Sequence, residues 1–331
     1  MLTPPKGLPE AALAAALGRW WGMSVTAADY LAVGWGSHHW AVTDAAGTRW
    51  FVTADELEHK RVTEREPLDA AFGRLRAALA AATDLRDSGA AFVVAPVQAG
   101  DGEPLVRVND GFGVAVYPFL DAQRFDWGEF SSPEHRLGVL RLVTAVHTAP
   151  AAASRRAPVD DFSVPHRDAL EAALDPANDA AGRGPYALRT SLLVRGNAEP
   201  IRQLLARYDG LVARARPGRA VLTHGEPHPG NTMLTASGWM LIDWDTALVA
   251  PPERDLWLID SGDGTMLDAY ADATGVSPVP DLVEAYRLRW TVADIAVDVG
   301  RFRRPHAGTP EDDKAWGFLA SVVERLGQQP S

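Results

Sequence analysis

Cysteine is absent from the 331-residue sequence, which excludes disulfide frameworks and thiolate-bound metal centres. Long apolar runs are also absent, because no stretch approaches the ~18 residues that a membrane-spanning helix needs. The N-terminus has no basic start followed by an apolar stretch, so it does not resemble an export signal. From these absences we expect a cytoplasmic protein without a membrane partner.

Basic residues are in deficit, with 32 Lys and Arg against 43 Asp and Glu and a formal net charge of −11. This balance argues against nucleic acids and anionic membranes as partners. It favours a cationic small-molecule partner, although a solvated acidic surface would explain the charge equally well. Lysine is especially scarce and occurs only as Lys6, Lys60 and Lys314. The sequence leaves the oligomeric state open.

The remaining composition, 47% hydrophobic and 23% charged residues, is that of an ordinary globular protein with an ample core. Strand-like runs at 38–43, 49–54, 92–94, 105–108 and 112–117 accompany helical patterns at 9–21 and 67–86. After residue 121 the pattern becomes helical, at 133–147, 168–174, 198–214, 253–260, 281–301 and 312–326. We therefore predict an α+β chain with a small antiparallel-sheet lobe (1–120) and a larger, mainly helical lobe (121–331).

Residues 224–231, His-Gly-Glu-Pro-His-Pro-Gly-Asn, form the most informative stretch of the chain. Glu226 and Asn231 have the spacing of the acid and the amide in a kinase catalytic loop, with His224 two places before the acid. Residues 232–235 and 239–242 are typical of a short hairpin that ends at Asp243. Such a hairpin would place Asn231 beside Asp243, and their oxygens would suit magnesium. The pattern indicates phosphoryl transfer, with Glu226 orienting the acceptor hydroxyl.

This stretch resembles the aminoglycoside phosphotransferase family and its choline-kinase-like relatives. Their motif is His-Gly-Asp-x-His-x-x-Asn, then Ile-Asp-Trp or similar, then Asp-Pro-x-x-Asp-Leu. The matching residues here are His224, Gly225, His228, Asn231, Ile242, Asp243, Asp255 and Leu256. The resemblance implies a bilobal protein-kinase-like fold, with ATP or GTP between the lobes and Mg2+ held by Asn231 and Asp243. It also implies transfer of the terminal phosphate to a hydroxyl of a small polar molecule. An amino sugar or aminocyclitol is the expected acceptor, with antibiotic resistance as an associated role.

The resemblance also assigns roles to nearby residues. His224 is expected to pack beneath the loop and hydrogen-bond its backbone, and Asp255 to brace the loop from the large lobe. His228 lines the magnesium site in one interpretation and is a second scaffold residue in the other. Asp245 either lies just behind the metal ligands or, as the favoured alternative, caps the following turn.

The phosphate side of the site is predicted from the small lobe. Gly34, Gly36 and Ser37 lie just before the strand predicted at 38–43. In a kinase they would form the glycine-rich loop, whose backbone amides approach the phosphates because glycine has no side chain. An ordinary tight turn is the alternative. Tyr117 begins the segment expected to bind the nucleotide base, and an edge strand ending at Pro118 is the alternative there.

Two residues depart from the family pattern. Glu226 stands where the family has Asp, and positional errors of about 1 Å can cost ~100-fold in rate. Thr53 stands where a strand lysine would bind phosphate, and Arg74, in the helix predicted at 67–86, is a candidate replacement. Alternatively Arg74 is an exposed helix residue, and Lys60 or backbone amides hold the phosphates. The departures keep open a rival function, a pseudokinase that binds a nucleotide or another ligand without transfer.

The helix predicted at 281–301 carries a candidate acceptor site. Trp290, Asp294 and Asp298 follow one another at one-turn spacing and therefore share a face. Two carboxylates beside an aromatic ring would suit an amine-bearing sugar. A solvated polar stripe is the alternative interpretation of this face.

Overall fold

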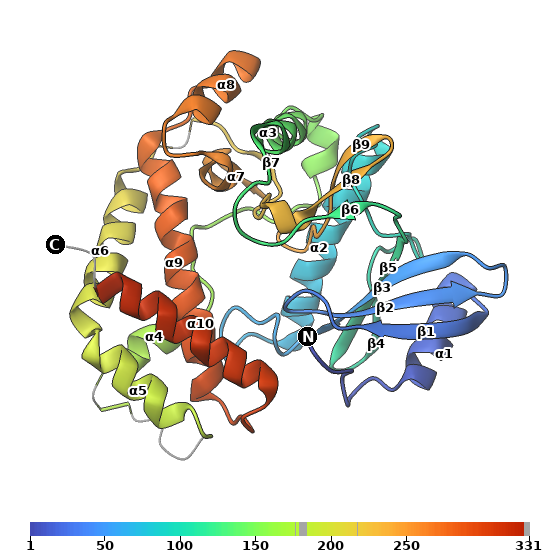
Figure 1. Ribbon diagram of the computed structural model, residues 1–331, viewed down its shortest axis with the longest axis horizontal. Helices are drawn as coiled ribbons and strands as arrows, with labels where there is room; N and C mark the ends of the chain where they lie inside the picture. Colours follow the sequence, from blue (N-terminus) through green and yellow to red (C-terminus); the bar gives the residue numbers. More distant parts are fainter. Residues whose placement is uncertain (176, 179–183, 217, 328–331) are drawn as a thin grey trace.

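The computed structural model describes residues 1–175, 177–178, 184–216 and 218–327. A β-sheet lobe at the N-terminal end faces a larger lobe built mainly from helices (Figure 1). This arrangement confirms the predicted α+β, bilobal, protein-kinase-like fold. No helix within these residues has the length and apolar character to cross a membrane.

The sheet of the small lobe has five antiparallel strands in the order β1-β2-β3-β5-β4. They span Val25–Leu31 (β1), His38–Asp44 (β2), Arg49–Glu56 (β3), Val106–Asn109 (β4) and Phe112–Pro118 (β5). Trp40 and Val52 are buried in a core with helix α1 (Glu10–Trp21). Because side chains alternate along a strand, the pair His39 and Thr53 lies on the opposite face of the sheet.

One predicted strand of this sheet was wrong. Val93, in the run predicted at 92–94, makes only an isolated bridge to Leu241 of the helical lobe. Strand β1 supplies the fifth strand instead. Its residues are all exposed or half-buried, so no apolar run reveals it, whereas the apolar run at 92–94 packs into a core between the lobes.

Helix α2 (Leu68–Asp87) connects the lobes through that shared apolar core. Its Leu75 and Leu79 belong to one cluster with Leu222 and Trp244 of the helical lobe. The cluster extends across residue 120, where the sequence predicts the boundary between the lobes. Apolar burial therefore couples the two sides of that predicted boundary.

Helix α9 (Pro280–Arg303) lies at the centre of the helical lobe and packs most extensively against four of the other helices (Figure 1). These are α4 (Arg167–Leu174), α6 (Ala198–Arg214), α7 (Glu253–Ile259) and α10 (Pro310–Gly327). The lobe also contains β6 (Gln123–Arg124), α3 (Pro133–His147), the 3-10 turn η1 (Ala151–Ser154), α5 (Ala187–Gly196) and α8 (Thr265–Thr274). Val292, Ile295 and Val299 of α9 are buried in the core of the lobe.

Short strands form the part of the helical lobe nearest the sheet lobe. Strands β7 (Val221–Thr223) and β10 (Leu248–Ala250) pair with each other, and β8 (Thr232–Thr235) pairs with β9 (Gly238–Leu241). The second pair confirms the predicted hairpin. At its end Ile242 N donates to Asn231 O over 3.0 Å, which holds the 3-10 turn η2 (Pro229–Asn231) next to Asp243.

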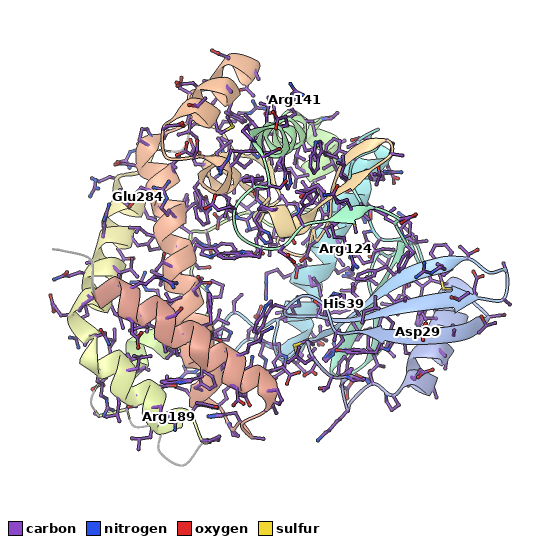
Figure 2. All side chains as sticks on the ribbon, in the orientation of Figure 1. Asp29, His39, Arg124, Arg141, Arg189 and Glu284 are labelled. Atoms are coloured by element: carbon purple, nitrogen blue, oxygen red, sulfur yellow. The ribbon has the colours of Figure 1, made fainter. Side chains whose placement is uncertain are left out.

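The orientation of labelled side chains shows which surfaces of the lobes face each other. In Figure 2, His39 of β2 lies on the side of the sheet lobe that faces the helical lobe, and Arg124 of β6 lies where the helical lobe approaches the sheet. Glu284 and Arg189 lie on the outer side of the helical lobe in the same view. The face of the sheet that carries His39 and Thr53 is therefore directed toward the 224–231 loop and its hairpin.

Candidate active site

Asp255, at the start of α7, holds the 224–231 loop in place. Its carboxylate accepts hydrogen bonds from the backbone N of His224 (2.9 Å) and of Gly225 (2.6 Å). His147 Nε2 lies 3.0 Å from the same carboxylate, and both side chains are fully buried. Burial alone would raise the pKa of Asp255, but the hydrogen bond from His147 and the charges of His147, Arg254 and His224 together outweigh it and lower that pKa below its usual value. A buried, ionised and fully hydrogen-bonded carboxylate thus fixes the loop from the large lobe.

Position 225 of the loop accepts only glycine. Its φ is +100°, and an added Cβ would lie 2.4 Å from the Arg254 guanidinium. That guanidinium is itself fixed, because it donates to Thr223 Oγ1 (2.8 Å) and to Thr246 O (2.7 Å). Only a residue without a side chain fits between the loop and this buried arginine.

His224 connects the loop to the hairpin. Its Nε2 lies 2.8 Å from Ile242 O, and its Nδ1 accepts from the backbone N of Glu226 at 3.2 Å. These partners assign the neutral tautomer with the proton on Nε2, and burial lowers the pKa of His224 accordingly. Both ring nitrogens are therefore occupied in holding backbone, which agrees with the scaffold role expected from the sequence.

The side chain of Glu226 is 35% exposed, and the charges of Lys60 and of Asp294 on α9 both act on its carboxylate. Desolvation of the Glu226 carboxylate, and then the negative charge of nearby Asp245, raises the pKa of Glu226 to about 7. Its nearest basic neighbour, His228 Nε2, is 3.9 Å away. Burial lowers the pKa of His228 to about 4, so this ring is neutral near pH 7. Glu226 is thus an accessible carboxylate poised close to neutral pH, as a general base requires.

Asn231 and Asp243 lie near each other, because the backbone N of Ile242 donates to Asn231 O over 3.0 Å. The Nδ2 of Asn231 donates to the carbonyl of Glu226 over 3.0 Å, so its Oδ1 is the atom left for another ligand. Asp243 has a left-handed backbone with φ +65°. In the described part of the chain its carboxylate has no hydrogen-bond or ion-pair partner. An amide oxygen and a free carboxylate are the ligands that magnesium accepts alongside phosphate and water.

The charge around Asp243 also fits a divalent cation. Burial, and then the neighbouring Asp245, raise the pKa of Asp243 well above its usual range; Glu226 and Asp55 act in the same direction. Lys60 is the opposing cation, so negative charge is in surplus there. No group of three or more His, Asp or Glu among the described residues forms a metal cage. An ion at this place would therefore depend on phosphate and water to complete its ligands.

Lys60 occupies the space between the sheet lobe and the hairpin. Its Nζ lies 2.7 Å from Asp245 Oδ2 and 3.0 Å from Asp55 Oδ1. Ser37 Oγ is 3.4 Å from the same Nζ and donates to Asp55 over 2.6 Å. Desolvation would lower the pKa of Lys60, but the two carboxylates outweigh it and raise the pKa well above its usual value. Asp245 thus pairs with a lysine from the other lobe, which sequence reasoning did not anticipate.

The other residues predicted on the phosphate side lie in the β1–β2 loop and on strands β3 and β5. Gly34 (φ +68°) and Gly36 (φ +80°) shape the exposed loop between β1 and β2. Thr53, on β3, pairs with Ala115 of the neighbouring strand β5, which also carries Tyr117. Burial, followed by the charges of nearby aspartates that include Asp243, raises the pKa of Tyr117 well above its usual value.

Arg74 is directed elsewhere. The sequence offered it as a phosphate ligand without an acidic partner. In the structure its guanidinium forms an ion pair with Glu66 and donates to the backbone carbonyl of Lys60. It therefore supports the segment that carries Lys60.

The predicted acceptor residues lie on α9, across from the loop. Trp290 packs against Trp257 of α7 with ring centroids 5.5 Å apart. Asp294 is close enough to Glu226 that its charge contributes to the raised pKa of Glu226. Burial raises the pKa of Asp294 and of Asp298 to about 7, and each carboxylate adds to the negative charge of this face.

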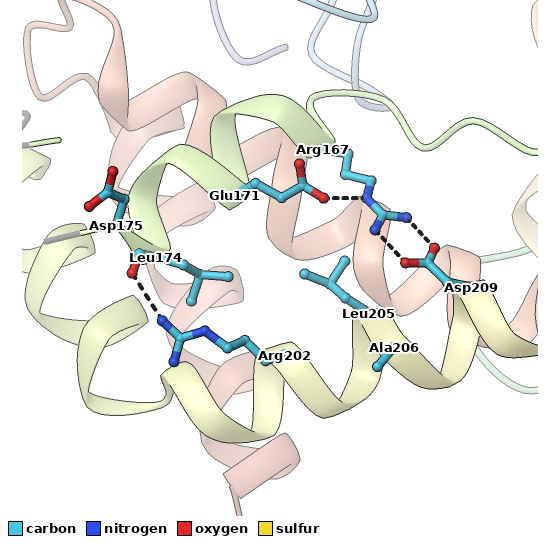
Figure 3. Close-up of a pocket in the computed structure, with 8 residues that line it drawn as sticks. All are labelled: Arg167, Glu171, Leu174, Asp175, Arg202, Leu205, Ala206 and Asp209. Carbon is cyan, nitrogen blue, oxygen red and sulfur yellow. Dashed lines mark hydrogen bonds and ion pairs between the residues drawn. The ribbon is translucent and has the colours of Figure 1, made fainter. Parts of the chain in front are cut away.

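A separate surface hollow lies between α4 and α6 (Figure 3). Its lining residues are Arg167, Glu171, Leu174, Asp175, Arg202, Leu205, Ala206 and Asp209. Arg167 pairs there with Glu171 at 2.7 Å and with Asp209, and Arg202 donates to Leu174 O at 3.2 Å. None of the predicted site residues lines this hollow.

Comparison with known proteins identifies relatives of the whole arrangement. The model of the phosphotransferase enzyme family matches residues 30–296. Protein StrN of Streptomyces griseus is 33% identical over 249 residues, which cover 72% of this chain and 74% of StrN.

Solved structures share the fold. A spectinomycin phosphotransferase in complex with ADP and spectinomycin superposes with a TM-score of 0.70 at 16% identity, covering 96% of this chain and 97% of that one. Choline kinase LicA from Streptococcus pneumoniae superposes with a TM-score of 0.57 at 14% identity, covering 97% and 99%. The family match, the StrN match and the shared fold agree with the resemblance found in residues 221–258. The chain belongs to the phosphotransferase enzyme family.

Proposed function

We propose that this protein is a small-molecule kinase that transfers the terminal phosphate of ATP or GTP to a hydroxyl of a polar, cationic acceptor. The observation that supports the proposal most is that one accessible carboxylate, Glu226, lies near enough to Asp243 for their charges to interact, while Asn231 is hydrogen-bonded to the backbone of Glu226 and of Ile242. Family membership and a structural neighbour that was solved with ADP support it.

In this proposal the residues of the site have different roles. Glu226 orients the acceptor hydroxyl and takes its proton as the new oxygen–phosphorus bond forms and the bond from phosphorus to the leaving diphosphate breaks. Asn231 and Asp243 would hold magnesium, which when bound neutralises charge on the phosphate oxygens. Gly34 and Gly36 let backbone amides approach those phosphates.

The side chain of Glu226 decides where the acceptor must lie. It is one methylene longer than the aspartate of the family pattern, so its carboxylate extends further from the braced loop. We infer that the acceptor oxygen is displaced by about 1 Å in the same direction, because rates are sensitive to errors of this size.

A cationic acceptor is favoured by the chemistry of α9. Asp294 and Asp298 supply negative charge, and the indoles of Trp257 and Trp290 supply aromatic faces that attract cations. An amino sugar or aminocyclitol carries the ammonium groups and hydroxyls that such a face would bind. The spectinomycin bound in a structural neighbour supports this class of acceptor.

The alternative function is a pseudokinase that binds nucleotide or another ligand without transfer. Thr53 in place of a strand lysine and Glu226 in place of aspartate favour it. The unpaired oxygens of Asn231 and Asp243 favour the enzyme, because a protein that only binds has less need of both.

Thermal unfolding with ATP or GTP, with and without magnesium, tests nucleotide binding. We expect a magnesium-dependent rise in melting temperature at millimolar nucleotide, because a ligand that binds only the folded state stabilises it. No rise with either nucleotide would reject the kinase and also the pseudokinase that binds nucleotide. A screen of amino sugars, aminocyclitols and simple amino alcohols for phosphate transfer would then separate the enzyme from the pseudokinase.

A further inference from the structure

The site has phosphate-binding glycines but lacks the strand lysine, because β3 has Thr53 at that position. We infer that Lys60, from the turn after β3, binds the nucleotide phosphates in place of the missing strand lysine. This inference rests on the proposed function.

The position of Lys60 supports the assignment. Its Nζ lies 3.8 Å from where a Cβ on Gly36 would lie, and 3.4 Å from Ser37 Oγ, so it lies beneath the glycine-rich loop. Asp243 is near enough for its charge to act on the Lys60 ammonium. The Lys60 amine therefore lies near both features that would contact the phosphates, namely the glycine-rich loop at Gly36 and the proposed metal ligand Asp243.

Two carboxylates around Lys60 position its ammonium group. Asp55 lies on β3 two residues after Thr53 and therefore on the same face of the sheet. Its pairing with Lys60 at 3.0 Å positions the amine from the small lobe, and Asp245 positions it from the hairpin at 2.7 Å. Helix α2, whose only acidic residues are Asp69, Asp84 and Asp87, is not needed for this role.

The segment that carries Lys60 is tied to the helical lobe. The carbonyl of Val62 accepts from His166 N at the start of α4 over 2.7 Å. Glu58 lies 3.6 Å from Arg304, just after α9. Lys60 is thus held in place by large-lobe helices, whereas a lysine at position 53 would be held by the sheet.

Arg74 acts in this scheme as a positioning residue. Its guanidinium holds the backbone carbonyl of Lys60, and its partner Glu66 accepts from Val62 N over 2.7 Å. Loss of Arg74 should therefore weaken phosphate binding through Lys60 and not by removing a phosphate contact.

Titration of the full chain with ATP and with adenosine, in the presence of magnesium, tests the assignment. Lys60→Gln removes the charge but keeps hydrogen-bonding groups for Asp55 and Asp245, so folding should be retained. We expect ATP affinity to fall about 10- to 100-fold, the usual effect of losing a charge-assisted contact. Adenosine affinity should stay unchanged. Lys6→Gln, at an exposed lysine, is the matched control and should bind ATP as the wild type does.

A rescue and a double variant complete the test. Thr53→Lys in the Lys60→Gln background should restore most of the ATP affinity by returning a lysine to the strand. Arg74→Ala should weaken ATP binding alone, yet add little in the Lys60→Gln background, because residues acting through one contact are not additive. Wild-type ATP affinity in Lys60→Gln, or full additivity with Arg74→Ala, would overturn the inference. A wild-type protein that binds no nucleotide would instead reject the proposed function.

Discussion

At the scale of single residues, the proposed function assigns the proton transfer to Glu226. We predict that Glu226→Gln lowers turnover by roughly 100- to 10,000-fold, the range for a lost general base, and leaves nucleotide affinity nearly unchanged. Steady-state rates and ATP titrations check this. Glu226→Asp tests whether the site has adapted to the longer side chain. Loss of activity would indicate that it has. A gain in activity would indicate that glutamate is a less effective base here than aspartate. Unchanged turnover in Glu226→Gln would remove this residue from the mechanism.

The carboxylates of α9 predict a pH dependence of acceptor binding. The pKa values of Asp294 and Asp298 are raised to about 7, so both lose charge as the pH falls through 7. Arg325 and Arg301 act against these shifts, and Trp290 opposes that of Asp294 by hydrogen bonding. We expect KM for a cationic acceptor to rise several-fold between pH 8 and pH 6, while KM for ATP changes less. Equal changes in both would contradict a role for α9 in acceptor binding.

The raised pKa of Asp298 also predicts that this residue lowers the free energy of unfolding at neutral and higher pH. An acid whose folded pKa lies above its unfolded value near 3.9 binds more protons in the folded state, so stability falls as the pH rises toward 7. Asp298→Asn should therefore raise the free energy of unfolding by about 1–3 kcal/mol at pH 8 and by less at pH 5. Urea unfolding at both pH values measures it. Asp268→Asn, at an exposed aspartate of α8, should show no such difference.

What the sequence reveals about single residues depends on distance along the chain. Glu226, Asn231 and Asp243 fall within one loop and one hairpin, so their spacing alone indicates their proximity. Lys60 and Asp245 are 185 residues apart, and nothing in their local sequence indicates a contact. The scarcity of lysine made Lys60 an alternative candidate for phosphate binding, but no sequence pattern indicated its pairing with Asp245.

At the scale of elements, the braced loop depends on Gly225. We predict that Gly225→Ala lowers the free energy of unfolding by at least about 3 kcal/mol, because backbone strain and a clash with a fixed guanidinium add together. Gly102, with φ +84° and nothing within 4 Å of an added Cβ, isolates the backbone part. Gly102→Ala should cost only about 1 kcal/mol. If urea unfolding showed the same loss of free energy for both variants, the Arg254 side chain would be able to move aside without an energetic penalty.

Elements with a clear apolar pattern were predicted well, and others were not. Helix α3 has the predicted bounds because a Ser132 cap and Pro133 begin it and a buried stripe continues it. Helix α5 was missed because it exposes Leu188 and Leu192, which blurs its apolar face. Helix α8 was missed because Tyr270 is its one fully buried residue, and β1 because it has none. An apolar pattern in the sequence predicts a helix or strand only where that element buries a single continuous apolar face.

At the scale of the whole molecule, the shared core around α2 predicts cooperative unfolding. Leu75 and Leu79 pack with Leu222 and Trp244 across the predicted lobe boundary, so separating the lobes would expose this apolar surface. We expect a single calorimetric transition for the full chain. A fragment of residues 1–120 should bind a hydrophobic dye and unfold without a sharp transition. Two resolved transitions, or a stable fragment, would show that the sheet lobe folds alone.

The tethered segment around Lys60 has a consequence for proteolysis. A protease that cuts only after lysine has three sites in this chain, at Lys6, Lys60 and Lys314. The carbonyl of the bond after Lys60 is held by Arg74, and the flanking Glu58 and Val62 are held by Arg304 and α4. Cleavage there requires the segment to detach first, since proteolysis follows local opening. The rate of that one cut would report how often the two lobes release each other.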